Sequence, residues 1–232
     1  MSRATNGVST YEDPLTHLPH KSVQEFARGQ VIYSPANPAT CLYLVILGRV
    51  KVSTAERDGN ETVARIVCKE GLFGESSLIG ALEGTETAIA LDNVTLMGWT
   101  RNEIELQIER DPRLGVALSQ YLVRECLELQ DRMESMVVHR TPERVMLALV
   151  QLASNTGTKT ADGTTRVASL THQTIAEYVG TSREIVTFQL NRLRKLGMIK
   201  YSRKYMDIDV PQVRDALKMP QTAPRVQRTG AA

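Results

Sequence analysis

The sequence predicts an α+β protein in which an all-β half is followed by a long helix and then by a mostly helical half. Three observations carry this prediction: short runs rich in β-branched residues up to about residue 100, a long helical pattern after residue 110, and two helices joined by a glycine turn near residue 180. The expected domains are 1–110, 111–139 and 140–218, and a disordered tail is expected at 219–232.

Length and composition exclude several classes of protein. The 232 residues are 42% hydrophobic and 23% charged, which is ordinary for a globular chain. No apolar run approaches the ~20 residues needed to span a bilayer. The N-terminus has neither the basic start nor the apolar stretch of a signal peptide, so a cytoplasmic location is expected.

Charge is distributed unevenly along the chain. Residues 1–139 hold 13 Lys and Arg against 19 Asp and Glu, a net charge of −6, whereas residues 140–232 hold 15 against 7, a net charge of +8. A basic C-terminal half favours contact with a polyanion, although an uneven solvated surface explains the same skew. The cysteines Cys41, Cys68 and Cys126 are too scattered for a disulfide framework or a zinc or iron–sulfur site, so reduced thiols are expected.

Six short apolar runs predict the strands of a β-barrel or sandwich. Gly, Asn, Asp or Pro separates them at intervals typical of such folds. The runs are QVIYS, CLYLVILG, RVKVSTAE, ETVARIVC, TAIALDN and VTLMGWT, all between residues 30 and 100. Asp58-Gly59-Asn60 predicts a hairpin turn, because Gly and Asn tolerate the positive φ that such turns need.

Asp111-Pro112 predicts the start of a long helix that continues to about residue 138. One apolar stripe recurs at heptad spacing and predicts the seam of a homodimer. The seam residues are Leu122, Cys126, Leu129, Met133 and Met136. Leu114, Leu118 and Tyr121 form a second apolar face that is placed to pack on the β domain. Burial of the seam between two domains of one chain is the alternative.

A helix is predicted over HQTIAEYVG, and a second over TSREIVTFQLNRLRKLGMI at 181–199. Thr181 and Glu184 form a T-x-x-E capping box, so the second helix is expected to begin near Ser182. The helical period predicts an inward face of Ile185, Val186, Leu190, Leu193 and Leu196. SRKYMDIDV follows as a predicted hairpin. This is a helix-turn-helix pattern with a wing, which binds DNA.

The opposite face of the second helix predicts contacts with bases. Its residues are Arg183, Glu184, Thr187 and Phe188. Arg183 can donate to guanine, Glu184 can accept from cytosine, and Phe188 can lie against a thymine methyl. Contacts with phosphates are predicted for Thr171, Gln173, Ser182, Lys200, Arg203 and Lys204. In the alternative interpretation Glu184 only caps the helix, Arg183 only forms surface pairs, and Phe188 packs on a neighbouring element.

The order of a β domain, a long helix and a winged helix-turn-helix resembles the CRP/FNR family of bacterial transcription regulators, over residues 22–217. LYLVILGRVKVS and GLFGESSLIG look like the family's barrel and its FGE-x-x-L ligand cassette. GTSREIVTFQLNRLRKLGMI looks like its recognition helix. The resemblance implies a cupin-like, cyclic-nucleotide-binding jelly roll, a homodimer on a near-palindromic operator, and RNA polymerase as a further partner.

The sequence departs from the cyclic-AMP-responsive branch of the family at two places. Thr85 or Glu86 stands where that branch has an arginine for the cyclic phosphate, and a carboxylate would repel that phosphate. Leu129 and Gln130 stand where it has Thr-Ser for the adenine. A degenerate effector pocket is therefore expected, made of Gly74, Glu75, Ser76, Thr85, Glu86, Leu129 and Gln130. Phe188 also replaces a base-reading arginine, so the operator is expected to differ at one position.

No cofactor is expected, and cyclic AMP is not expected to bind. Residues 1–30 lack the cysteine cluster of the oxygen-sensing branch. His17 and His20 are candidate haem ligands, but a surface pair is the favoured interpretation. Cys126 either pairs with its twofold mate on oxidation or is a small buried thiol, and the reducing cytosol favours the second. The β domain has either lost its ligand or holds a different small molecule.

The hypothesis is therefore a homodimeric, sequence-specific DNA-binding regulator that cyclic AMP does not control. The alternative is a small-molecule sensor that acts mainly through protein–protein contacts, which the basic half and the pair Arg183 and Glu184 argue against. The sequence contains no recognisable nucleophile–base pair or metal set, so an enzyme is not expected.

Overall fold

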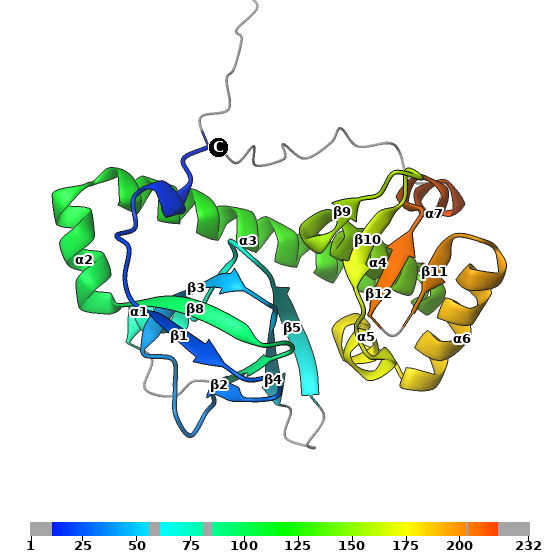
Figure 1. Cartoon of the computed structure of the whole chain (residues 1–232), viewed down its shortest axis with the longest axis horizontal. Coiled ribbons are helices and arrows are strands. Elements are labelled where there is room, and N and C mark those ends of the chain that lie inside the picture. The colour runs from blue at the N-terminus through cyan, green and yellow to red at the C-terminus, as the bar shows by residue number, and fades with distance from the viewer. Residues whose placement is uncertain (1–10, 56–60, 81–84, 203, 218–232) are drawn as a thin grey trace, which may run out of the picture. The chain divides into compact units, whose positions relative to one another are not determined.

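The computed structural model describes residues 11–55, 61–80, 85–202 and 204–217 (Figure 1). The chain divides into two compact units, Met1–Val138 and His139–Ala232. Three predicted features lie outside the described residues: the turn Asp58-Gly59-Asn60, Arg203, and the tail at 219–232.

The first unit is built on two four-stranded antiparallel sheets, in the orders β1-β8-β3-β6 and β2-β7-β4-β5. Each of the six predicted runs forms a strand, and the short strands β1 and β6 were not predicted. The sheets form a jelly roll and do not close into a barrel. The strands are β1 Val23–Phe26, β2 Val31–Tyr33, β3 Cys41–Leu47, β4 Val50–Ala55, β5 Glu61–Val67, β6 Leu72–Phe73, β7 Glu86–Ala90 and β8 Val94–Thr100.

Strand β8 shows how the sequence assigns residues to two cores. Side chains alternate along a strand, so Val94 and Leu96 face the space between the two sheets, where they are buried. Met97 and Trp99 face the other way, into a second buried cluster that includes residues of the helices. The indole Nε1 of Trp99 donates to the backbone oxygen of Pro19 at 2.9 Å, which satisfies its polar group. The sheet is therefore covered on both faces.

Four helical segments complete the first unit: η1 Pro14–Thr16, α1 Ser76–Ile79, α2 Arg101–Arg110 and α3 Arg113–Val138. Helix α2 was not predicted because it is mostly polar, and Ile104 is its one fully buried residue. A capping box between Thr100 and Glu103 fixes its start. The long helix α3 begins at Arg113, one residue after the predicted Pro112, and Asp111 caps it as predicted, because its Oδ1 accepts from the amide of Arg113 at 3.1 Å.

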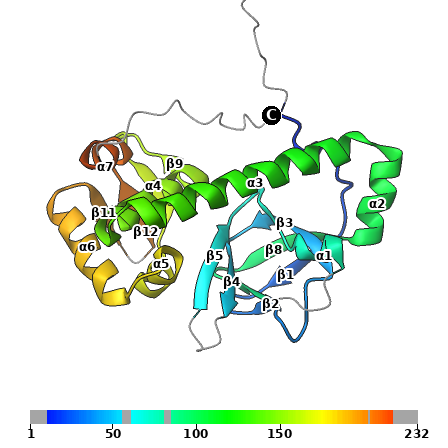
Figure 2. The same cartoon turned by 180° about the vertical axis from the view of Figure 1, so that it is seen from behind.

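Helix α3 lies along the jelly roll, as the reverse view shows (Figure 2). Leu114, Leu118 and Tyr121 are buried in one cluster with Leu42 and Trp99, which confirms the predicted packing face. Among the described residues, none of the helices combines the length and apolar composition that a membrane crossing requires.

The second unit packs helices on a four-stranded sheet of order β11-β12-β10-β9. The α5–α6 pair and the hairpin of β11 and β12 confirm the predictions, whereas β9 and α7 were not predicted. The elements are α4 Thr141–Thr156, β9 Thr158–Lys159, β10 Thr165–Ala168, α5 His172–Val179, α6 Arg183–Lys195, β11 Ile199–Tyr201, β12 Tyr205–Ile208 and α7 Val210–Ala216.

The inward face of α6 is narrower than predicted. Val186, Leu190 and Leu193 are buried in the core of the unit. Ile185 and Leu196 are 41% and 54% exposed, so their predicted burial was wrong. The core of the unit covers only one side of α6. Gln189, which is 5% exposed, is buried on that side.

Candidate nucleic-acid interface and effector site

Two capped helices and a tight turn build the helix-turn-helix. Thr171 caps α5 by accepting from the amide of Thr174 at 3.0 Å, and Gly180 ends it with a left-handed φ of 71°. The cap of α6 is Ser182, whose hydroxyl accepts from the amide of Ile185 at 3.4 Å. The predicted cap Thr181 was wrong, because its amide donates to the oxygen of Ala176 and continues the final turn of α5.

The outward face of α6 is exposed where base contacts are predicted. Arg183 and Glu184 are exposed at its first turn, and Phe188 is 66% exposed one turn further along. Phe188 therefore does not pack on a neighbouring described element. Hydrogen bonds from its own backbone amide and from the Ser182 hydroxyl hold the pKa of Glu184 below its usual range. The carboxylate stays ionised at neutral pH and remains an acceptor.

Thr187, the fourth predicted base contact, is half-buried in a small network. Its hydroxyl donates to the carbonyl of Arg183 at 2.8 Å and also lies 2.8 Å from Nδ1 of His172. The His172 ring meets the ring of Tyr201 edge to face, and the Tyr201 hydroxyl donates to Asn191 at 3.4 Å. These contacts join α5, α6 and β11. Sequence reasoning missed His172 and Tyr201, because no spacing in the sequence relates them.

The predicted phosphate-binding residues differ in their contacts and in their exposure. Thr171 and Ser182 serve as caps, and the Gln173 amide donates to Glu177 at 2.9 Å. Lys200 and Lys204 are exposed on the hairpin. These residues lie on α5, α6 and the wing of one unit, together with the outward face of α6.

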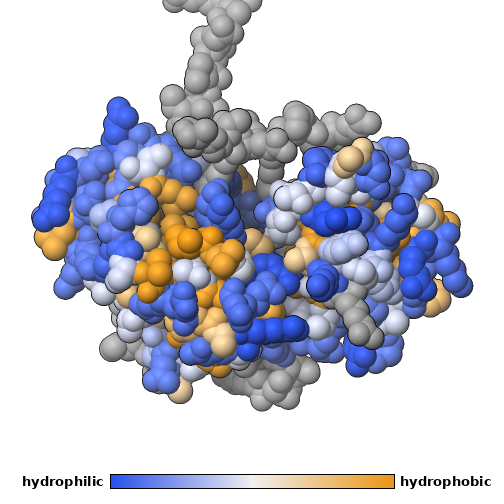
Figure 3. Space-filling view, in the orientation of Figure 1, coloured by the Kyte–Doolittle hydropathy of each residue, from blue (hydrophilic) through white to orange (hydrophobic). Residues whose placement is uncertain are grey.

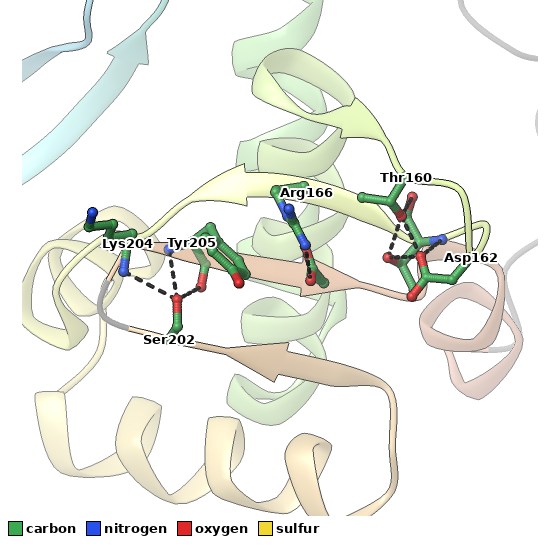
Figure 4. A network of polar contacts seen from close by, with 8 residues as sticks. Thr160, Asp162, Arg166, Ser202, Lys204 and Tyr205 are labelled. Carbon is green, nitrogen blue, oxygen red and sulfur yellow. Dashed lines mark hydrogen bonds and ion pairs between the residues drawn. The ribbon is translucent and has the colours of Figure 1, made fainter.

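The wing is tied to the neighbouring strand by side-chain contacts (Figure 4). Arg166 on β10 donates from Nε and Nη2 to the two carboxylate oxygens of Asp207 on β12, at 2.6 and 2.8 Å. The same guanidinium lies over the Tyr205 ring, 4.0 Å from its centroid. At the tip, the Ser202 hydroxyl accepts from the amides of Lys204 and Tyr205, both at 3.3 Å. These bonds fix the position from which Lys204 projects.

In the predicted effector cassette, Glu75 is hydrogen-bonded to side chains of other elements of the first unit. Gly74 has a φ of 83°, and a Cβ there would lie 2.6 Å from the oxygen of Cys41, so the position requires glycine. The next residue, Glu75, accepts from Nη2 of Arg65 on β5 at 2.8 and 2.7 Å. Nη1 of Arg65 donates to Glu125 on α3 at 2.6 Å. Arg65 therefore bridges the cassette and the long helix.

The hydroxyl of Tyr121 reinforces this bridge. It donates to the oxygen of Leu72 at 2.9 Å and lies 3.2 Å from Glu75. Sequence reasoning missed Arg65, Tyr121 and Glu125, although an arginine inside the apolar strand ETVARIVC was a usable signal. Leu129 and Gln130 on α3, which were predicted to belong to the degenerate pocket, are exposed.

The remaining predicted pocket residues lie on two other elements. Ser76 begins α1, Thr85 is exposed just before β7, and Glu86 is the first residue of β7. Burial raises the pKa of Glu86, while Arg65 opposes that shift. Glu86 thus adds a third carboxyl group to the surroundings of Arg65.

The predicted seam of α3 is uncovered in the single chain. Leu122, Leu129, Met133 and Met136 are 40%, 46%, 68% and 45% exposed, and Cys126 is exposed. Hydrophobic residues also reach the surface over the strands of the first unit (Figure 3). Exposure alone therefore does not identify a partner surface. The heptad spacing of these residues on α3 is the additional observation that favours a dimer seam.

The side chain of the candidate haem ligand His17 is only 11% exposed, so the predicted surface pair is wrong for His17, whereas His20 is exposed. Its Nδ1 lies 2.7 Å from Asp111 and its Nε2 lies 3.3 Å from Glu12. Within the described ranges, no three His, Cys, Asp or Glu side chains gather as metal ligands would.

Comparison with known proteins identifies two domain families in this chain. Residues 23–111 match the family model of the cyclic nucleotide-binding domain, and residues 143–216 match that of the Crp-like helix-turn-helix domain. The two matches cover the jelly roll and the helix-turn-helix with its wing.

Relatives that match most of the chain are transcription regulators. The transcriptional regulator SdrP of Thermus thermophilus is 30% identical over 177 residues, which cover 75% of this chain and 83% of SdrP. The CRP-like cAMP-activated global transcriptional regulator of Mycobacterium tuberculosis is 28% identical over 180 residues, 78% of this chain and 80% of that one. A crystal structure of a CRP/FNR-family regulator from Thermus thermophilus superposes with a TM-score of 0.68 at 27% identity, over 85% of this chain and 98% of that chain.

Proposed function

Because this chain belongs to the CRP/FNR family of transcription regulators and carries its helix-turn-helix domain, we propose that it is a homodimeric, sequence-specific DNA-binding regulator that cyclic AMP does not control. The observation that carries the proposal is the exposed face of α6, where Arg183, Glu184 and Phe188 project from a helix held by a buried opposite face. The place of action is the cytoplasm, and RNA polymerase is the expected protein partner.

The chemistry of that face suits the major groove. Arg183 offers a planar fork of donors to the O6 and N7 of guanine, and Glu184 is an ionised acceptor for the N4 of cytosine. Exposed lysines of the wing supply charge for phosphates, and the half of the chain that carries them has a net charge of +8. Each bidentate base contact contributes ~1–3 kcal/mol of discrimination.

Dimerisation supplies the second recognition helix, which binds the second half-site of the operator. The seam residues of α3 are exposed in one chain, and their spacing fits the seam of a two-helix coiled coil. Two recognition helices then reach successive major grooves of a near-palindrome, ~34 Å apart.

The Arg65 bridge supports control without cyclic AMP. Arg65 is the cation nearest the cassette carboxylate, yet Nη2 is bonded to Glu75 and Nη1 to Glu125. Binding an anionic phosphate there would place it near Glu75 and Glu86 and would require Arg65 to leave its partners. The degenerate pocket residues therefore provide no vacant cation for a cyclic phosphate.

Selection of duplexes from a random pool tests DNA recognition. The purified parent protein is expected to enrich a near-palindrome, and Arg183→Ala is expected to lose at least fivefold in affinity for it, since one base contact is worth ~1–3 kcal/mol. Arg192→Ala is the matched control, because Arg192 is an exposed arginine of the same helix outside the base-contacting set. Equal affinities of the parent, Arg183→Ala and Arg192→Ala would contradict base recognition by α6.

A further inference from the structure

His172 is the first residue of α5, and the contacts with bases and phosphates proposed above give it no role. It lies between α6 and the wing, with Nδ1 2.8 Å from the Thr187 hydroxyl. Its ring is 6.1 Å from the Tyr201 ring, at an interplanar angle of 78°. The side chain is half-buried, so these neighbours restrict its orientation.

The hydrogen bonds of Thr187 determine where the His172 ring carries its proton. The Thr187 hydroxyl has one proton, which it donates to the carbonyl of Arg183 at 2.8 Å. Its oxygen then accepts from Nδ1 of His172, so Nδ1 is protonated. In the neutral ring, Nε2 consequently has a lone pair and no proton. Nε2 makes no hydrogen bond with the described residues and is not among their buried unpartnered atoms.

A phosphate oxygen only accepts hydrogen bonds, so it cannot pair with Nε2 of the neutral ring. The imidazolium form carries a proton on each nitrogen, and it can keep the bond to Thr187 while Nε2 donates to phosphate. In a helix-turn-helix the first helix crosses the DNA backbone, and its N-terminus favours an anion. His172 stands at that N-terminus.

We propose that His172 is a further DNA-contacting residue, which donates from Nε2 to a backbone phosphate only as imidazolium, so that operator binding takes up one proton per half-site. The inference rests on the proposed function, because it needs an operator. It deepens that function by making the affinity for DNA depend on pH.

The surroundings of the ring favour this linkage. Burial, and then the positive charge of Arg183 on α6, hold the pKa of His172 below its usual range. From β11 the ring faces the Tyr201 ring, and among the described residues no carboxylate offsets Arg183 at this site. The free protein therefore carries a mostly neutral ring at pH 7, and a phosphate in the complex favours the charged form.

The test is the affinity of the full chain for its selected operator at pH 8, 7 and 6, at constant ionic strength. The parent is expected to bind about tenfold more tightly per half-site at pH 6 than at pH 8, equivalent to about 1.4 kcal/mol. His172→Gln is expected to remove that dependence. His172→Arg keeps a permanent charge and is expected to bind with little pH dependence and more tightly than the parent at pH 8. His139→Gln is the matched control and should keep the parent profile.

A second variant separates this role from a merely structural one. Thr187→Val removes the acceptor that holds the proton on Nδ1, so the neutral ring can place its proton on Nε2 and still donate to phosphate. Its pH dependence should therefore shrink. At pH 6, loss of a phosphate contact in His172→Gln should also reduce the slope of log affinity against log salt by about 0.9 per half-site.

The outcomes distinguish the inference from the function beneath it. An operator bound with the same affinity at pH 8 and pH 6, or a pH dependence that His172→Gln retains, overturns the role of His172 alone. Selection of no duplex, together with an Arg183→Ala variant that binds DNA as the parent does at every pH, overturns the proposed function as well.

Discussion

Nη2 of Arg65 donates to both carboxylate oxygens of Glu75, at 2.8 and 2.7 Å, and so joins strand β5 to the cassette that follows β6. The same guanidinium reaches Glu125 of α3. In this way an internal side chain links the jelly roll to the long helix. Nearby, Nη1 and Nη2 of Arg132 on α3 donate to the oxygens of Ala64 and Val63, the two residues that precede Arg65 on the same strand.

Replacing Arg65 by Leu should destabilise the first unit. The substitution leaves the partly buried carboxylates of Glu75 and Glu125 without their cation, a loss of about 2–3 kcal/mol by analogy with hydrogen bonds to charged groups. Chemical unfolding in urea measures it. Arg101→Leu removes an exposed pair with Glu105 and should change the free energy of unfolding by less than about 0.5 kcal/mol. Equal effects of the two substitutions would show that the bridge adds no stability.

Acid should weaken the first unit through Glu103. The Lys21 ammonium and the amide of Thr100 hold the pKa of Glu103 at about 2, below its usual value of 4.5. A carboxyl whose pKa is lower when folded stabilises the native state above its unfolded pKa, and this contribution disappears as pH falls from about 4.5 towards 2. Urea midpoints measured from pH 5.5 to 2.5 should fall more steeply for the parent than for Glu103→Gln. Parallel curves would exclude Glu103 as a source of the acid sensitivity.

Phe188 should recognise a thymine methyl. It is 66% exposed beside Arg183 and Glu184, and an apolar ring in the major groove contacts the C5 methyl group of thymine. Substituting deoxyuridine for thymine, one operator position at a time, removes that methyl group. At one position per half-site, this substitution should weaken binding of the protein about fourfold, since burial of a methyl group contributes ~0.8 kcal/mol. Phe188→Ala should be insensitive to deoxyuridine at that position, and a variant as sensitive as the parent would contradict the contact.

The α3 seam should be required for dimerisation. Leu129→Glu combined with Met133→Glu places like charges opposite each other across the proposed twofold axis, and the protein should become a monomer. Light scattering at micromolar concentration measures the mass. Leu106→Glu is the control, because Leu106 is 52% exposed on α2 outside the seam. A double variant that remains dimeric would place the dimer contact elsewhere.

The sequence predicted the regular parts of the fold well, for identifiable physical reasons. Short apolar runs bounded by turn residues marked β3 and β8, and the glycine after HQTIAEYV marked the end of α5, because both patterns are local. Helix α2 escaped prediction because Ile104 alone is fully buried, which leaves little helical period to detect. The burial of Ile185 and Leu196 was wrongly predicted, because helical periodicity does not determine how much of the circumference of a helix the core covers.

The candidate sites were predictable only in part. The outward face of α6 followed from the helical period, which places Arg183 and Phe188 opposite the buried residues. The pairs Arg65–Glu75 and His172–Thr187 join separate elements. Such pairings depend on the packing of whole elements, so no sequence motif predicts them.

Operator affinity with and without cyclic AMP tests most directly whether this regulator works without that nucleotide. The titration uses the full chain and its selected duplex by fluorescence anisotropy, at fixed pH and salt, with calorimetry of the nucleotide alone in parallel. The same dissociation constant at zero and millimolar cyclic AMP, with no heat of nucleotide binding, is the predicted result. Heat of binding together with a cyclic-AMP-dependent gain in operator affinity would contradict it, and would mean that Arg65 leaves Glu75 and Glu125 to admit the phosphate.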